Sequence, residues 1–343
     1  MRWAAAVWGF VAVMVAVAPL RTTAADGIAS TMLAAAIDHG GGPEVLRVRR
    51  LPVPKPKDDQ VLIAVRAAGV AVWDAGERQS PGKSAAFPLV LGTDGAGIVA
   101  AIGTAVHGFR VGDRVYGVAS GPSGFYAQYV ATGAEDVSHV PHGIGLVEAG
   151  VLAVSGLSAL QGLDDVLQLK RGETLLIHGA SGAVGTLAIQ FAKLRGVRVL
   201  ATVTDDAGAA LATRLGADAI VNGQTGDIRA AAKRFAPTGV DAVLGLAGGD
   251  ALERCIDAIR SDGHGRVAYL YGLNPIPRPR YGIRMTLYSF IADRHEFERL
   301  NEAVEATHLK VPIAAQYPLA DAAQAHERLK TGHFLGKIVL RVQ

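Results

Sequence analysis

Three glycines spaced three residues apart carry the strongest chemical signal in the sequence. Gly179, Gly182 and Gly185 stand between an apolar run at 174–178 and a segment whose apolar residues recur at helical spacing. Glycine permits a tight turn and lets the backbone approach a pyrophosphate, whose charge then lies at a helix N-terminus. A glycine triplet alone is a weak signal, but the flanking strand and helix supply the required context. We therefore predict a dinucleotide-binding loop here.

The end of the next strand should decide which nicotinamide cofactor binds, because an acidic residue there normally contacts the ribose about 20 residues past the glycine loop. Thr204 takes this position and Asp205 follows it. A hydroxyl of Thr204 could donate to the 2′-phosphate of NADP(H), whereas Asp205 on the ribose would favour NAD(H). Against NADP(H), residues 204–208 contain no lysine or arginine that could hold the phosphate. The residues alone leave both cofactors open.

The elements that must position this loop alternate between strand and helix from about residue 154. Apolar runs predict strands at 174–178, 197–203, 219–221, 240–244 and 266–271. Between them, helical periodicity predicts helices over 184–192, 207–215, 227–235 and 250–259. This alternation implies an α/β fold with a parallel sheet covered on both faces.

The chain before residue 154 follows a different pattern. Short apolar runs at 61–65, 97–102, 113–116 and 126–130 alternate with glycine turns, which predicts an irregular β-barrel or sandwich. The tail from about residue 291 contains helices and a last strand at 337–342.

Composition excludes several classes of protein. The chain has 343 residues, 50% of them hydrophobic and 19% charged, which excludes a disordered chain. Its one cysteine, Cys255, cannot form an intrachain disulfide or a multi-cysteine zinc knuckle. The net charge of +3 is spread along the chain, so no nucleic-acid surface is indicated.

The N-terminus carries a signal-like segment. Arg2 precedes an uncharged stretch over 3–20, and 23–25 resembles a cleavage site. Residues 1–25 therefore resemble a secretory signal peptide or a marginal membrane anchor. The alternative is a mis-assigned start, with Met32 opening the folded enzyme. We treat residues 1–31 as a signal-like or non-native extension outside the fold.

Motifs from residue 32 to the end resemble the medium-chain dehydrogenase/reductase superfamily, in its zinc-free quinone oxidoreductase-like (enoyl reductase) branch. Besides the glycine loop, the matching stretches are GGPEVL (41–46), LGTDGAGIVAAIG (91–103), VGDRVYG (111–117), GFYAQYV (124–130), LGADAIVN (215–222), GRVAYLYG (265–272) and HFLGKIVL (333–340).

This resemblance implies a two-domain architecture. A GroES-like β-domain over 32–153 would hold the substrate, and a Rossmann domain with a doubly wound parallel sheet would be inserted over 154–290. Residues 291–343 would return to the substrate domain. Family members commonly form homodimers through the open edge of the Rossmann sheet, so we expect a homodimer.

The resemblance also assigns cofactor contacts. Ser158 stands where the family has a hydroxyl residue near the nicotinamide, and the loop from Ser181 to Val184 would meet the pyrophosphate. That loop includes Gly182 and Ala183. The remaining implied contacts follow later strands or lie in the C-terminal motif: Leu246, Ala247, Gly272, Leu273, Phe334 and Lys337.

A proton for the acceptor would come from water or from a side chain, and Asp74 and Tyr126 are the candidate catalytic residues. The alternative for Tyr126 is a barrel aromatic with a satisfied hydroxyl. The alternative for Asp74 is a helix cap or an ion pair with Arg78.

Departures from the family bear on the chemistry. Ala71 replaces an expected asparagine in the substrate cleft, and Gly245 replaces an aspartate. Where zinc alcohol dehydrogenases supply a cysteine and a His-Glu pair, this chain has Trp73-Asp74 and Thr93-Asp94. The four-cysteine structural lobe is missing, and Cys255 is expected to be a buried small hydrophobe. We therefore expect no metal.

Without a Lewis acid, reduction of an already electrophilic acceptor is favoured. We predict an NAD(P)H-dependent oxidoreductase that transfers hydride to a quinone or an α,β-unsaturated carbonyl. The branch leans to NADP(H), with NAD(H) possible. The alternatives are a zinc-free alcohol or aldehyde reductase and a non-catalytic dinucleotide-binding protein. The expected partner is a small electrophilic acceptor, with no nucleic acid, no membrane for the folded part, and a cytoplasmic location.

Overall fold

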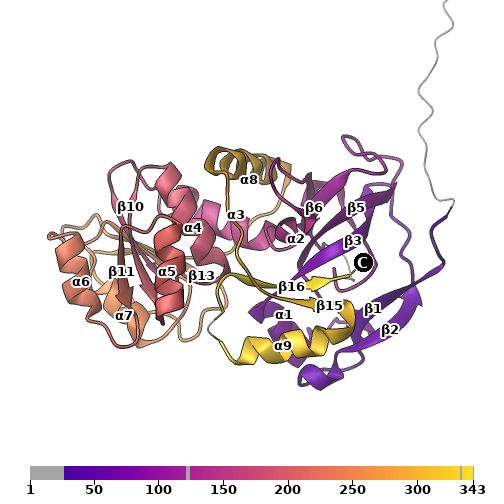
Figure 1. Ribbon diagram of the computed structural model, residues 1–343, viewed down its shortest axis with the longest axis horizontal. Helices are drawn as coiled ribbons and strands as arrows, with labels where there is room; N and C mark the ends of the chain where they lie inside the picture. The colour runs from indigo at the N-terminus through magenta and orange to yellow at the C-terminus, as the bar shows by residue number, and fades with distance from the viewer. Residues whose placement is uncertain (1–26, 121–123, 333, 343) are drawn as a thin grey trace, which may run out of the picture.

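The computed structural model describes residues 27–120, 124–332 and 334–342. Figure 1 shows two lobes, one built around a parallel sheet and the other rich in β-strands, with the C-terminal segment returning to the β-rich lobe. The signal-like residues 1–25 lie outside the described part. Within that part, no helix is both long and apolar enough to cross a membrane.

The first lobe contains a six-stranded parallel sheet in the order β11-β10-β9-β12-β13-β14. The order reverses between β9 and β12, which makes their carboxyl ends the topological switch point of a doubly wound sheet. This confirms the predicted α/β class. The strands are β9 (Thr174–His178), β10 (Arg198–Val203), β11 (Ala219–Asn222), β12 (Ala242–Gly245), β13 (Arg266–Leu270) and β14 (Arg284–Tyr288).

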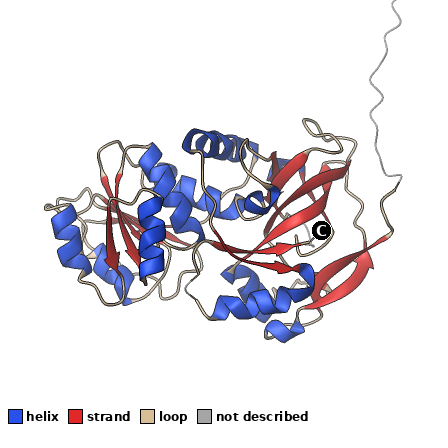
Figure 2. Cartoon of the chain, viewed as in Figure 1, coloured by secondary structure: helices blue, strands red, loops and turns tan. Residues whose placement is uncertain are grey.

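Helices cover both faces of this sheet (Figure 2). Because side chains alternate along a strand, Leu175 and Ile177 join one apolar cluster and Leu176 joins another on the opposite face. Two of the helices start at aspartates, Asp205 and Asp227, whose side chains cap them. The covering helices are α4 (Ala183–Leu194), α5 (Asp206–Arg214), α6 (Ile228–Phe235) and α7 (Asp250–Ile256).

The second lobe contains a seven-stranded sheet in the order β15-β16-β3-β5-β6-β8, with β7 also paired to β3, and a three-stranded sheet in the order β2-β1-β4. Its strands are β1 (Thr31–Ile37), β2 (Arg47–Pro52), β3 (Gln60–Val70), β4 (Leu89–Val90), β5 (Asp94–Ile102), β6 (Arg114–Val118), β7 (Tyr129–Gly133), β8 (Val137–His139), β15 (Ile313–Pro318) and β16 (Lys337–Arg341).

The C-terminal segment ties the two lobes together. After β14 the chain forms α8 (Arg294–Thr307), which packs on α3 (Ala153–Gln161) and α4. It then forms α9 (Ala322–Lys330) beside β15 and β16. Strand β16 pairs antiparallel with β3, so the end of the chain completes the sheet of the β-rich lobe.

Two helices lie where the sequence predicted none, α1 (Val72–Gln79) and α3 (Ala153–Gln161). Every residue of α3 is buried, so it has no polar face and no amphipathic period to detect. Shorter elements are α2 (Leu146–Ala149), a π-helical turn at Gly162–Val166, and 3₁₀ turns at Pro43–Val45, Ala134–Asp136 and Leu319–Asp321.

Candidate functional site

A cavity of about 230 Å³ lies where the carboxyl edge of the parallel sheet meets the β-rich lobe. The parallel sheet contributes the glycine loop and the turns after β12 and β13, and the β-rich lobe contributes the start of α1 and the C-terminal segment. The lining residues are Val70, Ala71, Val72, Trp73, Gly179, Gly182, Ala183, Val184, Gly185, Leu246, Leu270, Tyr271, Gly272, Leu273, Leu329, Phe334 and Lys337.

The glycine loop has the geometry that a pyrophosphate requires. Gly179 has a φ of 83°, in the left-handed region that favours glycine. A Cβ on Gly185 would lie 2.4 Å from the carbonyl oxygen of Gly179, so only glycine lets α4 start so close to the loop. Gly182 precedes the first turn of α4, whose N-terminal amides carry a partial positive charge toward the cavity. The loop therefore fits a dinucleotide phosphate.

The C-terminal segment closes over this loop. The N–H of Gly336 donates to the carbonyl oxygen of Ser181 at 2.9 Å, and Gly182 and Gly336 form an isolated parallel bridge. These contacts bring Phe334 and Lys337 into the cavity wall, although they lie far from the loop in the sequence.

Lys337 is the one charged side chain among the described residues that line the cavity. Its Nζ lies 2.9 Å and 2.8 Å from the two carboxylate oxygens of Asp94, and both side chains are almost fully buried. Asp94 also accepts the N–H of Val154 at 3.3 Å. The ring centroid of Trp73 lies 5.1 Å from Nζ, within the range of a cation–π contact. The cavity thus has an apolar wall with one fixed positive charge.

A buried hydrogen-bond chain lies behind the α1 side of the wall. Nη1 of Arg78 donates to Nδ1 of His326 at 2.7 Å, because a guanidinium can only donate. The proton of His326 is therefore on Nε2, which lies 3.1 Å from the hydroxyl of Tyr126. That hydroxyl donates to Oδ2 of Asp74 at 3.2 Å. Asp74 also accepts the N–H of Ala71, which makes it a cap of α1.

Burial dominates the titration of this chain of groups. It raises the pKa of Asp74 to about 6, and the charge of Lys337 opposes that rise. It lowers the pKa of His326 to about 3, with the charge of Arg78 acting in the same direction. Burial also raises the pKa of Tyr126 well above its usual value. At neutral pH, His326 and Tyr126 are therefore both neutral.

Comparison with known proteins identifies the family. The alcohol dehydrogenase GroES-like domain matches residues 57–153, and the zinc-binding dehydrogenase domain matches residues 215–340. Human quinone oxidoreductase is 30% identical over 323 residues, which cover 90% of this chain and 97% of that protein. This chain belongs to the quinone oxidoreductase-like branch of the medium-chain dehydrogenase/reductase superfamily.

Solved structures agree with this family. A mycobacterial protein complexed with NADPH is 30% identical, with a TM-score of 0.80 over 91% of this chain and all 100% of that one. A structure described as an NAD-dependent alcohol dehydrogenase is also 30% identical, with a TM-score of 0.84 over 91% of this chain and 100% of that chain. The predicted GroES-like and Rossmann architecture is therefore confirmed.

The cavity brings together most of the cofactor contacts that the family resemblance implied. Ten of them form its wall, from the glycine loop, the turns after β12 and β13, and the C-terminal motif: Gly179, Gly182, Ala183, Val184, Gly185, Leu246, Gly272, Leu273, Phe334 and Lys337.

The other implied residues do not line this cavity. Ser158 is buried in α3, where its carbonyl oxygen accepts the hydroxyl proton of Tyr288. Asp205 caps α5 by accepting the N–H of Gly208 at 2.7 Å. Ser181, Thr204 and Ala247 also lie outside the lining.

Asp74 and Tyr126 are buried behind the wall rather than exposed to the cavity. The N-terminus of α1 turns the carboxylate of Asp74 inward, where it caps the helix. This is the alternative that the sequence left open for Asp74. The hydroxyl of Tyr126 donates to Asp74 and accepts from Nε2 of His326, so both of its hydrogen-bonding roles are filled within the protein.

The positions that hold zinc ligands in alcohol dehydrogenases are occupied differently here. Thr93 donates to Asp74 through its hydroxyl at 2.9 Å, and Asp94 is paired with Lys337. The described residues contain no group of three histidine, cysteine, aspartate or glutamate side chains placed to hold a metal ion. Cys255 is buried among apolar residues, as predicted, and burial raises its thiol pKa to about 12.

Sequence reasoning did not single out His326, Trp73 or Tyr271 for this site. His326 lies on α9, and no motif links it to Tyr126 or Arg78 across such a sequence separation. Trp73 was noted only as a residue that is not a zinc ligand. Tyr271 directly precedes the predicted contact Gly272, which is the one signal that could have found it.

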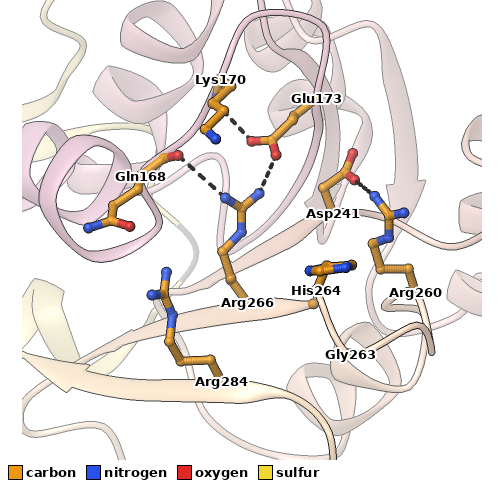
Figure 3. Close-up of a pocket in the computed structure, with 10 residues that line it drawn as sticks. Gln168, Lys170, Glu173, Asp241, Arg260, Gly263, His264, Arg266 and Arg284 are labelled. Atoms are coloured by element: carbon orange, nitrogen blue, oxygen red, sulfur yellow. Dashed lines mark hydrogen bonds and ion pairs between the residues drawn. The ribbon is translucent and has the colours of Figure 1, made fainter.

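A second cavity, of about 440 Å³, lies at the opposite, amino edge of the same sheet (Figure 3). It is lined mostly by charged side chains that pair with one another. Arg266 pairs with Glu173 at 2.7 Å, and Asp241 accepts the N–H and hydroxyl of Thr174. No glycine-rich loop or helix N-terminus was predicted at this edge.

Proposed function

We propose that this chain uses NADPH to reduce a quinone or an α,β-unsaturated carbonyl compound. The observation that carries the proposal is the cavity itself, in which the glycine loop and the N-terminus of α4 face an apolar wall with one fixed cation. When bound, the reduced nicotinamide supplies a hydride to the acceptor. The protein then has to bind the dinucleotide, orient the acceptor and exclude water.

The residues divide this work according to their place in the cavity. The loop from Gly179 to Gly185 and the first amides of α4 would hold the pyrophosphate. Leu246, Gly272 and Leu273 follow β12 and β13 and would support the nicotinamide half. Phe334, carried over the loop by the contact between Gly336 and Ser181, would close the site against water.

Lys337 is proposed to stabilise negative charge in the cavity. Its ammonium group has three N–H donors, and the two oxygens of Asp94 account for two of them. The third is available to an oxygen on which charge develops as a quinone or enone accepts hydride. An ammonium held in place before the reaction needs no reorganisation when that charge appears.

Asp74 and Tyr126 are proposed to position the wall rather than to touch the acceptor. The chain from Arg78 through His326 and Tyr126 to Asp74 links α9 to the start of α1. Since Ala71, Val72 and Trp73 line the cavity immediately before Asp74, this chain fixes the surface that faces the acceptor. The proton for the product would then come from Lys337 or from solvent.

The test is NADPH consumption by the purified full chain, followed by nicotinamide absorbance with quinones, enones, simple aldehydes and ketones. We expect turnover with quinones or enones. Turnover with aldehydes alone would support a zinc-free alcohol or aldehyde reductase instead. Cofactor binding without turnover of any acceptor would support the non-catalytic alternative.

A matched pair of variants links that activity to the cavity. Ala183→Asp puts a carboxylate at the first turn of α4, where it stabilises the helix but repels a pyrophosphate. Ala183→Asn has nearly the same size without the charge. We expect NADPH affinity to fall much more in Ala183→Asp than in Ala183→Asn, and equal losses would place the dinucleotide elsewhere.

We also propose a homodimer formed through the open edge of the parallel sheet. Strand β14 lies at that edge and carries the exposed side chain of Leu287, and the exposed Ile291 follows it shortly after. An unpaired strand edge invites pairing with a second copy. Sedimentation at micromolar concentration should give a dimer, and a monomer there would refute the proposal.

The cytoplasm is the proposed location, because a reductase that consumes NADPH needs a compartment in which that cofactor is regenerated. Fractionation of native cells should recover NADPH-dependent activity of this chain from the cytoplasm. Recovery from an exported fraction would overturn this location and leave the chemistry unaffected.

A further inference from the structure

Arg254 belongs to α7, and its side chain reaches the carboxyl edge of the parallel sheet. Its Nη2 donates to the carbonyl oxygen of Gly223 at 2.8 Å. Gly223 directly follows β11, and its own N–H donates to the carbonyl oxygen of Val203, the last residue of β10, at 2.8 Å. The guanidinium therefore lies over the ends of β10 and β11.

A second observation places the charge of Arg254 over the same edge. His178 is the last residue of β9, and its ring lies 2.8 Å from the hydroxyl of Thr202 on β10. Burial, with the nearby charge of Arg254 acting in the same direction, lowers the pKa of His178 to about 4. The hydrogen bond to Gly223 thus places the guanidinium at the end of β11, and its charge also reaches His178 at the end of β9.

Most of the N–H donors of Arg254 are available to a ligand. A guanidinium carries five N–H donors, and the carbonyl oxygen of Gly223 takes one of them. Arg254 is exposed and belongs to none of the ion pairs in the described part of the chain, and the neighbouring carboxylate of Glu253 pairs with Arg280 instead. Asp205, the acidic residue at the end of β10, is instead occupied as the cap of α5.

We propose that Arg254 binds the 2′-phosphate of NADP(H) and is the residue that makes this chain prefer NADP(H) over NAD(H). The inference rests on the proposed function, because the adenosine ribose of a dinucleotide lies at the end of the second strand of such a sheet. An arginine near that point can bind a 2′-phosphate by donating two parallel N–H hydrogen bonds to it. Gly223 has no side chain, so nothing from this residue covers the guanidinium.

The test compares ligands that differ only in this phosphate. Adenosine 2′,5′-diphosphate and adenosine 5′-monophosphate are titrated calorimetrically into the full chain, and NADPH and NADH are titrated by fluorescence. The variants are Arg254→Gln, which removes the charge, and Arg254→Lys, which keeps it without the fork. Arg229→Gln is the matched control, since Arg229 is an exposed arginine on the adjacent α6 that pairs with Asp257.

We expect the unmutated chain to bind the 2′-phosphorylated ligand of each pair more tightly. Arg254→Gln should weaken these ligands by about 10- to 100-fold, as expected for loss of charge-assisted hydrogen bonds, and change the others less than about twofold. The affinity of Arg254→Lys for the 2′-phosphorylated ligands should lie between those of the unmutated chain and Arg254→Gln. Arg229→Gln should bind all four ligands as the unmutated chain does.

Two results would overturn the assignment and leave the proposed function standing. One is an unmutated chain that binds both members of each pair equally. The other is an Arg254→Gln variant that binds the 2′-phosphorylated ligands as tightly as the unmutated chain does, or that loses equal affinity for both members of a pair. If the unmutated chain binds none of the four ligands, the proposed function fails together with this inference.

Discussion

The two edges of the six-stranded sheet use their cavities differently. The amino edge has the larger one, about 440 Å³ against about 230 Å³, but its wall consists mostly of arginine, lysine and carboxylate side chains. The carboxyl edge offers glycines, apolar side chains and a helix N-terminus. In a doubly wound sheet, ligands bind at the carboxyl ends of the strands near the switch point. The chemistry of the wall, and not the volume, distinguishes the candidate site.

Charges at the two edges also differ in their access to water. At the amino edge, Arg266 and Glu173 keep 14% and 23% of their side-chain surface exposed. Beside the cavity at the carboxyl edge, Lys337 and Asp94 of the β-rich lobe keep 4% and 0%. A carboxylate that loses its partner at the amino edge can be solvated, whereas Asp94 cannot. The same substitution should therefore have very different effects at the two edges.

Lys337→Met should produce the largest loss of stability. The variant leaves the buried carboxylate of Asp94 without its counter-charge, and breaking a buried pair in this way costs about 3–5 kcal/mol. Urea unfolding of the two proteins at neutral pH would measure the difference, provided that their unfolding free energies fall with urea concentration at the same slope. A loss below about 1 kcal/mol would mean that water reaches Asp94.

A double variant separates the unpaired charge from lost packing. Asp94→Asn in the Lys337→Met background removes the charge and keeps an oxygen for the N–H of Val154. We expect it to recover most of the lost stability while quinone or enone reduction stays impaired. Recovery of both would show that Lys337 serves the fold alone.

His326→Gln should change how stability depends on pH. The folded-state pKa of His326 is about 3, below its ordinary value of 6.5, so the unfolded chain binds a proton that the folded chain does not. Stability from this group is complete above about pH 6.5 and is lost as the pH falls, by about 2 kcal/mol between pH 7.5 and pH 5. The variant should lose that part of the slope. Unfolding curves at both pH values measure it.

Asp74→Asn should change the pH dependence of stability in the opposite direction. The folded-state pKa of Asp74 is about 6, above its ordinary 3.8, so acidification through pH 6 protonates the folded chain first and stabilises it. Removing the group should make the loss of stability on acidification larger, by about 1 kcal/mol over the same interval. Parallel curves for both variants and the unmutated chain would mean that these two groups are solvated.

The contrast between the edges also shows how far the sequence could lead. The parallel sheet was predictable because its strands are short apolar runs separated by helices with clear periodicity, and β9 matches its predicted bounds of 174–178. The glycine loop was predictable because φ and backbone approach restrict those positions to glycine. Each of these signals is local.

The unpredicted parts of the site depend on contacts between distant segments. Arg254 reaches Gly223 from another helix, and His326 reaches Tyr126 from α9, so no fixed spacing records either contact. The burial of Asp74 follows from its role as the cap of α1, a helix that the sequence did not predict. Motif spacing indicates the type of site, and tertiary packing decides which side chains face it.

Arg266→Met should have the smallest effect and completes the comparison, because it is the same cation-to-methionine change at the amino edge. Glu173 would lose its partner at 2.7 Å, but this partly exposed carboxylate would be solvated, and a pair that water can reach contributes about 0–1 kcal/mol. The variant also removes the buried Nε of Arg266, which has no hydrogen-bond partner among the described residues. An unsatisfied buried donor is destabilising, so its removal offsets part of the loss. Urea unfolding should therefore place Arg266→Met within about 1 kcal/mol of the unmutated chain, well above Lys337→Met. Equal losses in the two variants would show that exposure does not separate the edges.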